Sequence, residues 1–287
     1  MAPEQKPGMV RFYAGKEIAL LTKHGKQRVI NPVLEEALGC RVRHVDDYDT
    51  DLLGTFTMDV QRSGTQLDAA RRKARIAMGL SGLPFGLGSE GAFLPDPFIG
   101  LTPWNLELIV FIDSVRDLEV VGISQSQGNF RHLLTNDRSK LEAFAREVGF
   151  PGQQLALRPQ DEHDRRIHKG LSNWLALESA FASALTEAGM VFVETEGRAH
   201  ANPQRMANIG LAAANLAARL ASLCPSCGTP GYWQFERVAG LPCADCGAPT
   251  RETSAIVYGC IKCAHRETCK VQGLAHADPG RCDFCNP

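Results

Sequence analysis

The sequence predicts an α/β protein in which helices flank a mixed central sheet, with a small cysteine-rich domain after it. Three observations support this prediction. Strand-like apolar runs alternate with helical segments from residue 17 to residue 221, residues 64–78 have clear helical periodicity, and four Cys-x-x-Cys pairs follow residue 223. We therefore expect an α/β domain at residues 1–221 and a separate domain at residues 222–287.

The composition excludes a strong overall electrostatic field. The 287 residues include 31 Lys and Arg against 32 Asp and Glu, so no global charge favours nucleic acid or a membrane surface. No apolar run is long enough to span a membrane, and residues 1–21 lack the apolar stretch of a signal peptide. We expect a cytoplasmic protein that makes no membrane contact.

A basic turn follows the first predicted strand, residues 18–22. It reads Lys-His-Gly-Lys at residues 23–26, where an α/β protein presents backbone N–H groups and lysines to an anion; an ordinary basic turn is the alternative. The next helix either begins at Asn31, with Pro32 in its first turn, or is kinked there, and Gly39 ends it. Residues 41–45 are the second predicted strand, and the acidic run at 46–51 is interpreted as a solvated loop rather than a metal site.

The segment from residue 64 to residue 93 is the most informative part of the sequence. Apolar side chains form one stripe at helical spacing, and Arg71 and Lys73 lie at its two edges. Glycines then end the helix, and a buried strand leads to Ser89-Glu90-Gly91, which we interpret as a sharp acidic bend. A cationic helix followed by a carboxylate suits a site for phosphate and a divalent metal. A surface helix with an ordinary loop acid is the alternative.

The middle of the chain predicts a hairpin and then shorter elements. Residues 94–105 form a long loop, and the alternating segments 107–113 and 118–124 pair as a hairpin. A helix at 139–148, a strand at 154–158 and a charged linker at 161–169 follow. Residues 174–189 are a helix at clean helical spacing, and residues 190–193 are a strand.

A second polar turn follows that strand. It contains Arg198, His200, Asn202 and Arg205, and Pro203 then opens a long alanine-rich helix that reaches residue 223. These side chains are candidates for binding an anion or a nucleobase. For His200 alone, a hydrogen-bonded loop histidine is the alternative.

The C-terminal cysteines predict two structural zinc ions. Nine of the ten cysteines follow residue 223, and eight of them form four Cys-x-x-Cys turns, here called knuckles one to four: Cys224 and Cys227, Cys243 and Cys246, Cys260 and Cys263, Cys282 and Cys285. Two knuckles together supply the four thiolates that zinc prefers, and iron is the main rival. Hairpin strands are expected between the knuckles.

The sequence does not determine which knuckles bind the same zinc ion. Knuckle one with two and three with four is one option, and two with three and one with four is another. Cys269, His265 and His276 are spare or alternative ligands, and Cys40 is expected to be a buried structural thiol.

The charge of this C-terminal domain bears on its partners. Residues 224–287 contain six basic and six acidic side chains, and each zinc held by four thiolates adds a net charge of −2. Nucleic acid, which requires a basic surface, is therefore a less favoured partner than another protein. Four protein ligands leave no open position on the metal, so the predicted ions are structural rather than catalytic.

Two resemblances add to this interpretation. Lys-His-Gly-Lys at 23–26, the helix at 64–74, Ser89-Glu90-Gly91, the turn at 198–206 and the cysteine-rich tail resemble a family of uncharacterised bacterial proteins, a catalogued domain of unknown function. More remotely, the order of elements over residues 17–125 resembles the inosine/xanthosine triphosphate pyrophosphatase and Maf group. Those enzymes cleave nucleoside triphosphates to the monophosphate and pyrophosphate with Mg²⁺.

The second resemblance implies roles for several residues. Lys26, with Lys23, matches the phosphate-binding lysine of that group, Lys73 matches the lysine of its Asn-Ala-x-x-Lys-Ala helix (Ala69 stands at the asparagine position here), and Glu90 matches its metal-binding or basic carboxylate. The turn with Arg198 and His200 matches the late base-binding turn of the group. It implies an ITPase-like fold and a nucleotide-like substrate.

We therefore expect metal-dependent hydrolysis of a nucleotide-like phosphoanhydride, with zinc in the tail and Mg²⁺ or Mn²⁺ at the site. The alternative is a nucleotide- or anion-binding adaptor without catalysis, whose zinc ribbon contacts a protein or nucleic acid. A homodimer is compatible with the sequence. The expected catalytic residues are Lys26, Lys73 and Glu90, and the expected substrate-binding residues are Lys23, His24, Arg71, Ser89, Arg198, His200, Asn202 and Arg205.

Overall fold

The structure of the protein, a computed structural model, describes residues 11–48, 64–97 and 99–287. The chain separates into two compact units, one formed by Tyr13–Ala217 and the other mainly by residues 218–287. The long helix α5 (Pro203–Ala221) crosses the boundary between them. Five α-helices lie within the described residues, and none of them is long and apolar enough to cross a membrane.

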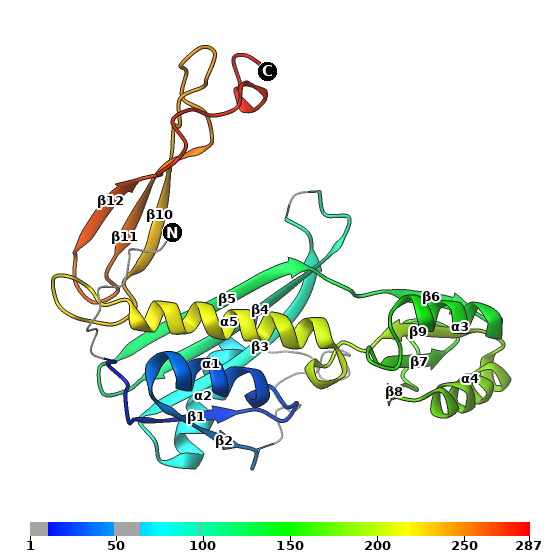
Figure 1. Cartoon of the computed structure of the whole chain (residues 1–287). Coiled ribbons are helices and arrows are strands. Elements are labelled where there is room, and N and C mark those ends of the chain that lie inside the picture. Colours follow the sequence, from blue (N-terminus) through cyan, green and yellow to red (C-terminus); the bar gives the residue numbers. More distant parts are fainter. Residues whose placement is uncertain (1–10, 49–63, 98) are drawn as a thin grey trace. The chain divides into compact units, whose positions relative to one another are not determined.

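The first unit contains two separate sheets (Figure 1). Its elements before the second sheet are β1 (Glu17–Leu21), α1 (Gln27–Leu38), β2 (Arg41–Val45), α2 (Gln66–Ser81), β3 (Phe85–Pro95), β4 (Pro103–Asp113) and β5 (Leu118–Gln127). The second sheet is built by β6 (His132–Thr135), α3 (Arg138–Glu147), β7 (Leu155–Pro159), β8 (His168–Leu171), α4 (Trp174–Ala188) and β9 (Val191–Thr195), followed by the short 3-10 helix η2 (Ala199–Ala201).

The larger sheet is mixed, as the sequence predicts, with strand order β2-β1-β3-β4-β5. Strands β2, β1 and β3 are parallel, whereas β3, β4 and β5 form an antiparallel meander. Strand β3 pairs with β1 only at residues 86–88 but pairs with β4 along its whole length. The second half of β3 therefore extends beyond the end of β1, at the carboxyl edge of the parallel strands.

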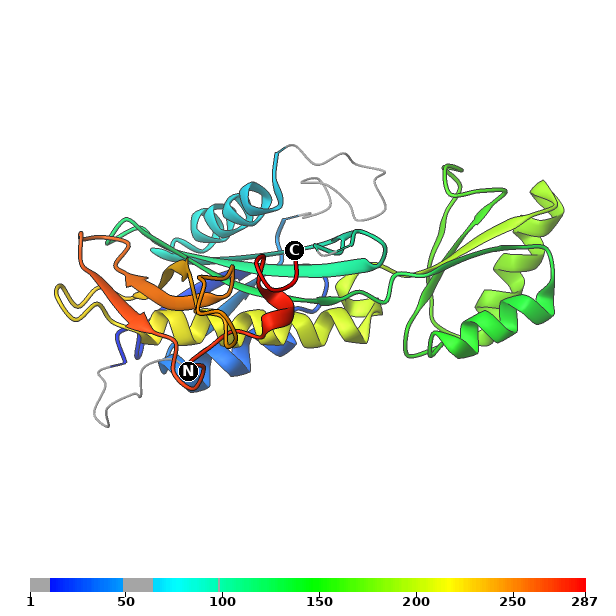
Figure 2. The same cartoon turned by 90° about the horizontal axis from the view of Figure 1, so that it is seen from above.

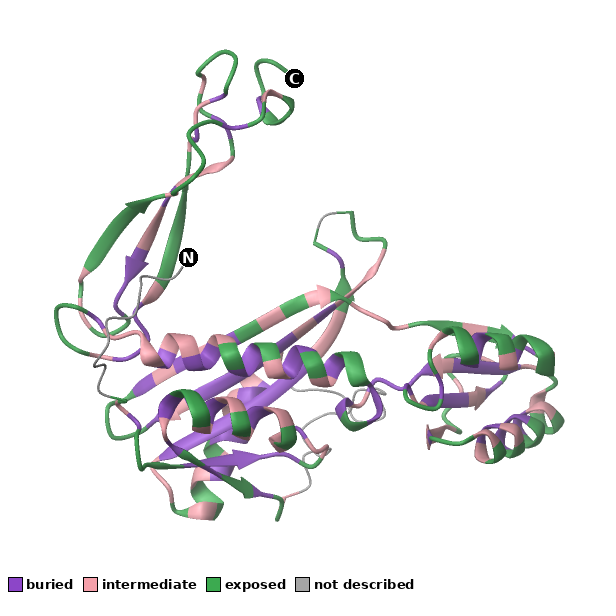
Figure 3. Ribbon diagram, viewed as in Figure 1, coloured by how far each residue is buried: buried purple, intermediate pink, exposed green. Residues whose placement is uncertain are grey.

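Helices cover both faces of this sheet (Figures 1 and 2). Helix α2 lies against the face to which Gly86 and Gly88 belong, because a Cβ atom on either glycine would meet α2 within 2.5 Å. Helix α5 lies on the opposite face, where a Cβ on Gly122 would meet its backbone at 2.5 Å. Helix α2 begins with a capping box between Thr65 and Asp68. Figure 3 shows the sheet buried between helices with exposed outer faces.

The smaller sheet has strand order β6-β9-β7-β8, and all its pairs are antiparallel. Helices α3 and α4 both pack on one face, around a core that includes Leu141, Leu155, Phe181 and Val193. The charged segment that the sequence predicts as a linker ends in β8, and the segments predicted as a helix at 174–189 and a strand at 190–193 form α4 and β9.

The second unit is a three-stranded antiparallel meander of β10 (Trp233–Ala239), β11 (Thr253–Gly259) and β12 (Arg266–Lys270), followed by the short 3-10 helix η3 (Pro279–Arg281). A knuckle stands before β10, between β10 and β11, directly after β11, and near the end of the chain. Tyr232 and Tyr258 pack with the first and third knuckles in a small core.

One local expectation was wrong. Ser89-Glu90-Gly91 is not a bend, because all three residues lie inside β3 and pair with Ile109, Leu108 and Glu107 of β4. Of the two options for the helix around Asn31, a start at Asn31 is excluded, because α1 starts at Gln27 and contains Pro32. The Asn31 amide donates to the Val42 carbonyl over 3.2 Å. Part of the acidic run, residues 49–51, lies outside the described residues.

Candidate functional site: two cysteine clusters and a buried charge cluster

Eight cysteines form two compact clusters in the second unit. Knuckles one and three form the first cluster and knuckles two and four form the second, with all ligand atoms of a cluster within 4.8 Å of one another. The closest Sγ–Sγ separations are 3.6 and 3.7 Å in the first cluster and 3.6 and 3.8 Å in the second. A tetrahedron with Zn–S bonds of about 2.3 Å has edges of about 3.8 Å, whereas a disulfide measures about 2 Å. Each cluster is therefore compatible with one structural zinc ion.

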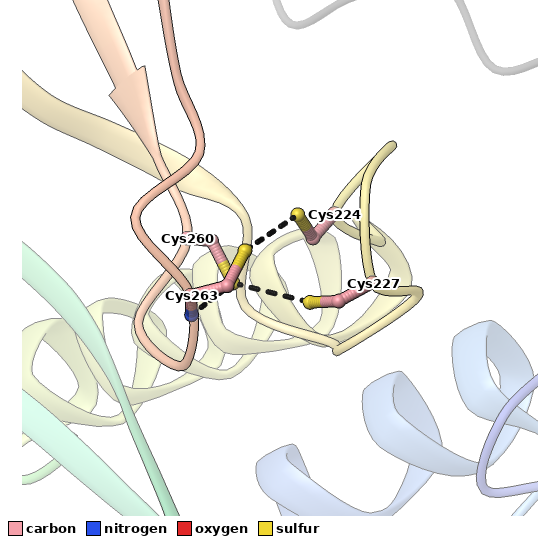
Figure 4. A group of neighbouring side chains, drawn as sticks. All are labelled: Cys224, Cys227, Cys260 and Cys263. Atoms are coloured by element: carbon pink, nitrogen blue, oxygen red, sulfur yellow. Dashed lines mark hydrogen bonds between the residues drawn. The ribbon is translucent and has the colours of Figure 1, made fainter.

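Figure 4 shows the four cysteines of the first cluster, and neighbouring groups hold their sulfur atoms in position. The backbone N–H groups of Lys262 and Cys263 donate to the Cys260 sulfur over 3.3 and 3.4 Å. The Arg266 guanidinium donates to the carbonyls of Cys260 and His265 over 2.8 and 2.9 Å and stacks on the ring of Phe235 at 4.1 Å. Such outer contacts orient metal ligands and limit their movement.

The observed pairing differs from both expected options. Strand β10 leads from knuckle one to knuckle two, and the antiparallel strand β11 returns the chain, so knuckle three lies beside knuckle one. The chain turns back again through β12, and knuckle four joins knuckle two. A meander with a knuckle at each turn therefore produces an interleaved pairing. Cys269, His265 and His276 belong to neither cluster of the described residues.

Cys40 is buried, as expected, and belongs to neither cysteine cluster. Its thiol lies 3.5 Å from the Leu34 carbonyl, and burial raises its pKa to about 11. Burial and a raised pKa both disfavour the reactive thiolate at neutral pH, which agrees with the structural thiol predicted from the sequence.

In the first unit, Lys26 lies at the centre of a buried charge cluster. It is the residue before α1, just beyond the end of β1, and only 6% of its surface is exposed. Its ammonium donates to the carbonyl and hydroxyl oxygens of Ser89 over 3.1 and 3.2 Å, and no ion pair joins it to a carboxylate of the described residues. Burial lowers its pKa to about 8, although the charges of Glu107 and Glu90 act in the opposite direction.

Two buried ion pairs lie beside Lys26. Lys73 contacts Glu90 at 2.5 Å, and Arg205 contacts both carboxylate oxygens of Glu107, at 2.6 and 3.1 Å. All four side chains are at most 11% exposed, and each charge acts on Lys26. With all five groups ionised, the cluster carries three positive and two negative charges. Lys26 is the cation in excess.

The two pairs lie on opposite faces of the larger sheet. Glu90 shares the α2 face with Gly88, because alternate residues of a strand point the same way. Gly91 points to the α5 face, where a Cβ would meet the Arg205 guanidinium at 2.0 Å and the Glu107 carboxylate at 2.3 Å. Lys26, at the edge of β3 beyond the end of β1, is close to both pairs.

The other predicted binding residues are distributed around this cluster. The rings of His24 and His200 stack with centroids 5.1 Å apart, so the first basic turn meets the second polar turn. The Asn202 amide oxygen accepts from the Arg205 backbone N–H over 3.0 Å. Lys23 is exposed.

The other two predicted arginines, like Arg205, form ion pairs with carboxylates. Arg71 forms an ion pair with Glu119 at 2.8 Å, on a partly exposed part of α2. Arg198 forms one with Glu196 at 2.8 Å. Burial alone would raise the pKa of Glu196, but the hydrogen bonds and charge of Arg198 outweigh it and lower that pKa.

The sequence reasoning missed Glu107. This residue is fully buried and accepts from the Asn105 amide as well as from Arg205, and Asn208 extends the network by donating to Asn105. Glu107 lies within a strand whose next residues are apolar, and a charge at a buried strand position was the signal that could have identified it.

These features define a protein of two parts: an α/β body with a charge cluster at the carboxyl edge of its parallel strands, and a zinc-ribbon-like meander with two clusters of four cysteines. The chain belongs to the family described as Domain of unknown function (DUF6671), which matches residues 73–287. The match includes four of the five clustered charges and all eight paired cysteines, whereas Lys26 lies before it. No curated protein and no solved structure matches the chain.

Proposed function

We propose that the α/β body binds the phosphates of a nucleotide-like molecule at Lys26 and hydrolyses a phosphoanhydride with the help of a divalent cation. The observation that carries this proposal is the excess positive charge of Lys26, which is buried and, within the described part of the chain, donates hydrogen bonds only to neutral oxygens. An incoming phosphate would supply the negative charge that the cluster lacks. The carboxyl edge of parallel strands is the usual place for such a ligand.

The other members of the cluster support the hydrolytic part of the proposal. Lys73 and Arg205 would stabilise negative charge that develops during phosphoryl transfer. Mg²⁺ commonly uses one or two carboxylates together with substrate phosphates, and Glu90 and Glu107 have the hard oxygen ligands that it requires. The donor set therefore fits Mg²⁺ or Mn²⁺, with Glu90 as the expected first ligand.

A non-catalytic adaptor is the second candidate, and one observation favours it. Both carboxylates already form close ion pairs, Glu90 with Lys73 at 2.5 Å and Glu107 with Arg205 at 2.6 Å, which reduces their availability to a metal. In this case the body would hold a nucleotide or another anion without cleaving it. The second unit, with two structural zinc ions, would contact a protein partner.

The deciding experiment measures pyrophosphate and phosphate release from a panel of canonical and modified nucleoside triphosphates, with Mg²⁺ or Mn²⁺. Lys26→Ala and Glu90→Gln are tested beside the wild type, and Lys140→Ala, at an exposed position of α3, is the matched control. We expect metal-dependent turnover that both site variants lose and the control retains. Saturable binding without turnover would favour the adaptor, and neither binding nor turnover with any triphosphate would remove both functions.

A further inference from the structure

Helices α3 and α4 leave one face of the smaller sheet uncovered (Figure 2). Residues 133, 155, 157, 191 and 193 belong to the core with α3 and α4, so their strand neighbours point to the opposite face. That face includes His132 on β6, Arg158 on β7, and Phe192 and Glu194 on β9, which are placed side by side by the strand register. A polar and aromatic surface of this kind is not needed to build the core.

A cavity of about 1220 Å³ lies over this face. Its wall has a flat aromatic part, because the rings of His132 and Phe192 are stacked with centroids 5.2 Å apart. Phe93 and Phe130 form a second ring pair in the wall, 5.6 Å apart. The volume exceeds the few hundred Å³ that a small ligand requires, and aromatic planes are the surfaces on which nucleobases stack.

Two polar groups of the wall have unused bonding capacity. The Arg158 Nε–H is buried and has no hydrogen-bond partner among the described residues, while its other nitrogens contact the Asp164 carbonyl at 2.9 Å and Glu194 at 3.5 Å. The Glu194 side chain is 13% exposed, and this long contact is its ion pair with Arg158. A buried N–H without an acceptor costs about 1–3 kcal/mol, so a ligand acceptor at this position would be favourable.

The cavity adjoins the charge cluster. Phe93 lies two residues after Gly91 on the same face of β3, a separation of about 7 Å along a strand. On the other side, the Gly197 carbonyl accepts a hydrogen bond from Arg205, and both Glu196 and Gly197 belong to the cavity wall. The cavity wall therefore reaches the Arg205–Glu107 pair of the charge cluster.

We propose that this cavity binds a purine base of the guanine type. The base stacks on the aromatic wall, its two adjacent N–H donors face the two oxygens of Glu194, and a base acceptor receives the free N–H of Arg158. This inference rests on the proposed function only for the phosphate end of the ligand, which extends toward Lys26. The binding of the base itself is independent of it.

Calorimetric titration with guanosine, which has no phosphate, tests the base site alone. Glu194→Gln keeps the size of the side chain but removes its charge, and Phe130→Ala removes part of the aromatic wall. Glu178→Gln, on α4 on the covered side of the sheet, is the matched control. Circular dichroism confirms that each variant is folded, and adenosine and inosine report which base edge is recognised.

We expect guanosine to bind the wild type and the control equally, to bind both site variants about 10-fold more weakly, and to bind better than adenosine. The Lys26→Ala variant should bind guanosine normally but guanosine triphosphate more weakly. No guanosine binding at millimolar concentration, or equal binding to the Glu194→Gln variant, would overturn the inference even if triphosphates are hydrolysed. Glu194-dependent guanosine binding, with triphosphate binding and turnover unaffected by Lys26→Ala, would sustain it while refuting the proposed function.

Discussion

Replacing Lys26 with methionine should make the protein more stable at neutral pH. Burial lowers the pKa of Lys26 from 10.5 to about 8, so the folded protein holds this proton less tightly than the unfolded chain. One pKa unit corresponds to about 1.4 kcal/mol, so the charged lysine destabilises the fold by on the order of 3 kcal/mol at pH 7. Methionine has a similar shape and no charge. Its introduction deprives the two Ser89 oxygens of a donor, which costs about 1 kcal/mol. The net gain is about 2 kcal/mol.

The sign of the pH dependence follows from the lowered pKa. Below pH 8, Lys26 is charged in both the folded and the unfolded state, and nearly the full destabilising effect of its charge is present. It declines as the pH rises from 8 toward 10.5, because folding then releases the proton that the unfolded chain still binds. The advantage of Lys26→Met should therefore be about 2 kcal/mol at pH 7 and close to zero near pH 10.

Urea unfolding followed by far-ultraviolet circular dichroism at pH 7, 8.5 and 10 measures this difference. Lys140→Met, at an exposed position, should change the stability by less than about 0.5 kcal/mol at every pH. A Lys26→Met variant that is less stable than the wild type at pH 7, or a difference that does not change with pH, would refute the reasoning. A confirmed gain would indicate that this lysine is retained for binding and not for folding.

Three further predictions concern other features. Gly91→Ala places a methyl group inside the buried ion pair on the α5 face and should destabilise the protein by about 3 kcal/mol or more, measured by the same urea titration. Native mass spectrometry should count one zinc ion in the Cys227→Ser/Cys263→Ser variant, because both changes affect the same cluster. It should count none in Cys227→Ser/Cys246→Ser, because each cluster loses one ligand. One ion in this second variant would contradict the interleaved pairing. Arg266→Ala should weaken zinc binding by the first cluster about 10-fold in a chelator competition without changing the second, and equal effects on both clusters would count against its local role.

Local patterns predicted most elements of the fold. The stripe of apolar residues and the flanking glycines predicted α2, and the alternation of residues 107–113 and 118–124 predicted the β4–β5 hairpin. Ser89-Glu90-Gly91 was misread because its composition is that of a turn, whereas pairing with β4 holds it in an extended strand. The division of the strands into two sheets depends on long-range pairing, which no local pattern contains.

The charge cluster was predicted in part. Four of its members were predicted as site residues because they are charges in turns or at helix edges, and the structure places them in one cluster: Lys26, Lys73, Glu90 and Arg205. Glu107 was missed because it lies within a strand, where its role depends on the register with Gly91. The pairing of the knuckles could have been derived, since the expected hairpin strands return the chain to its starting end at every second knuckle.

The interleaved pairing also means that two bound metal ions would act as crosslinks between distant parts of the backbone. With zinc bound, the first cluster closes the loop from residue 227 to residue 260, and the second closes the loop from residue 246 to residue 282. The loops overlap, so any single peptide bond cut between residues 228 and 281 leaves two fragments that at least one ion still joins. A proteolytic nick there would be silent until a chelator releases the fragments, which is how reducing agents reveal nicks in disulfide-bonded proteins.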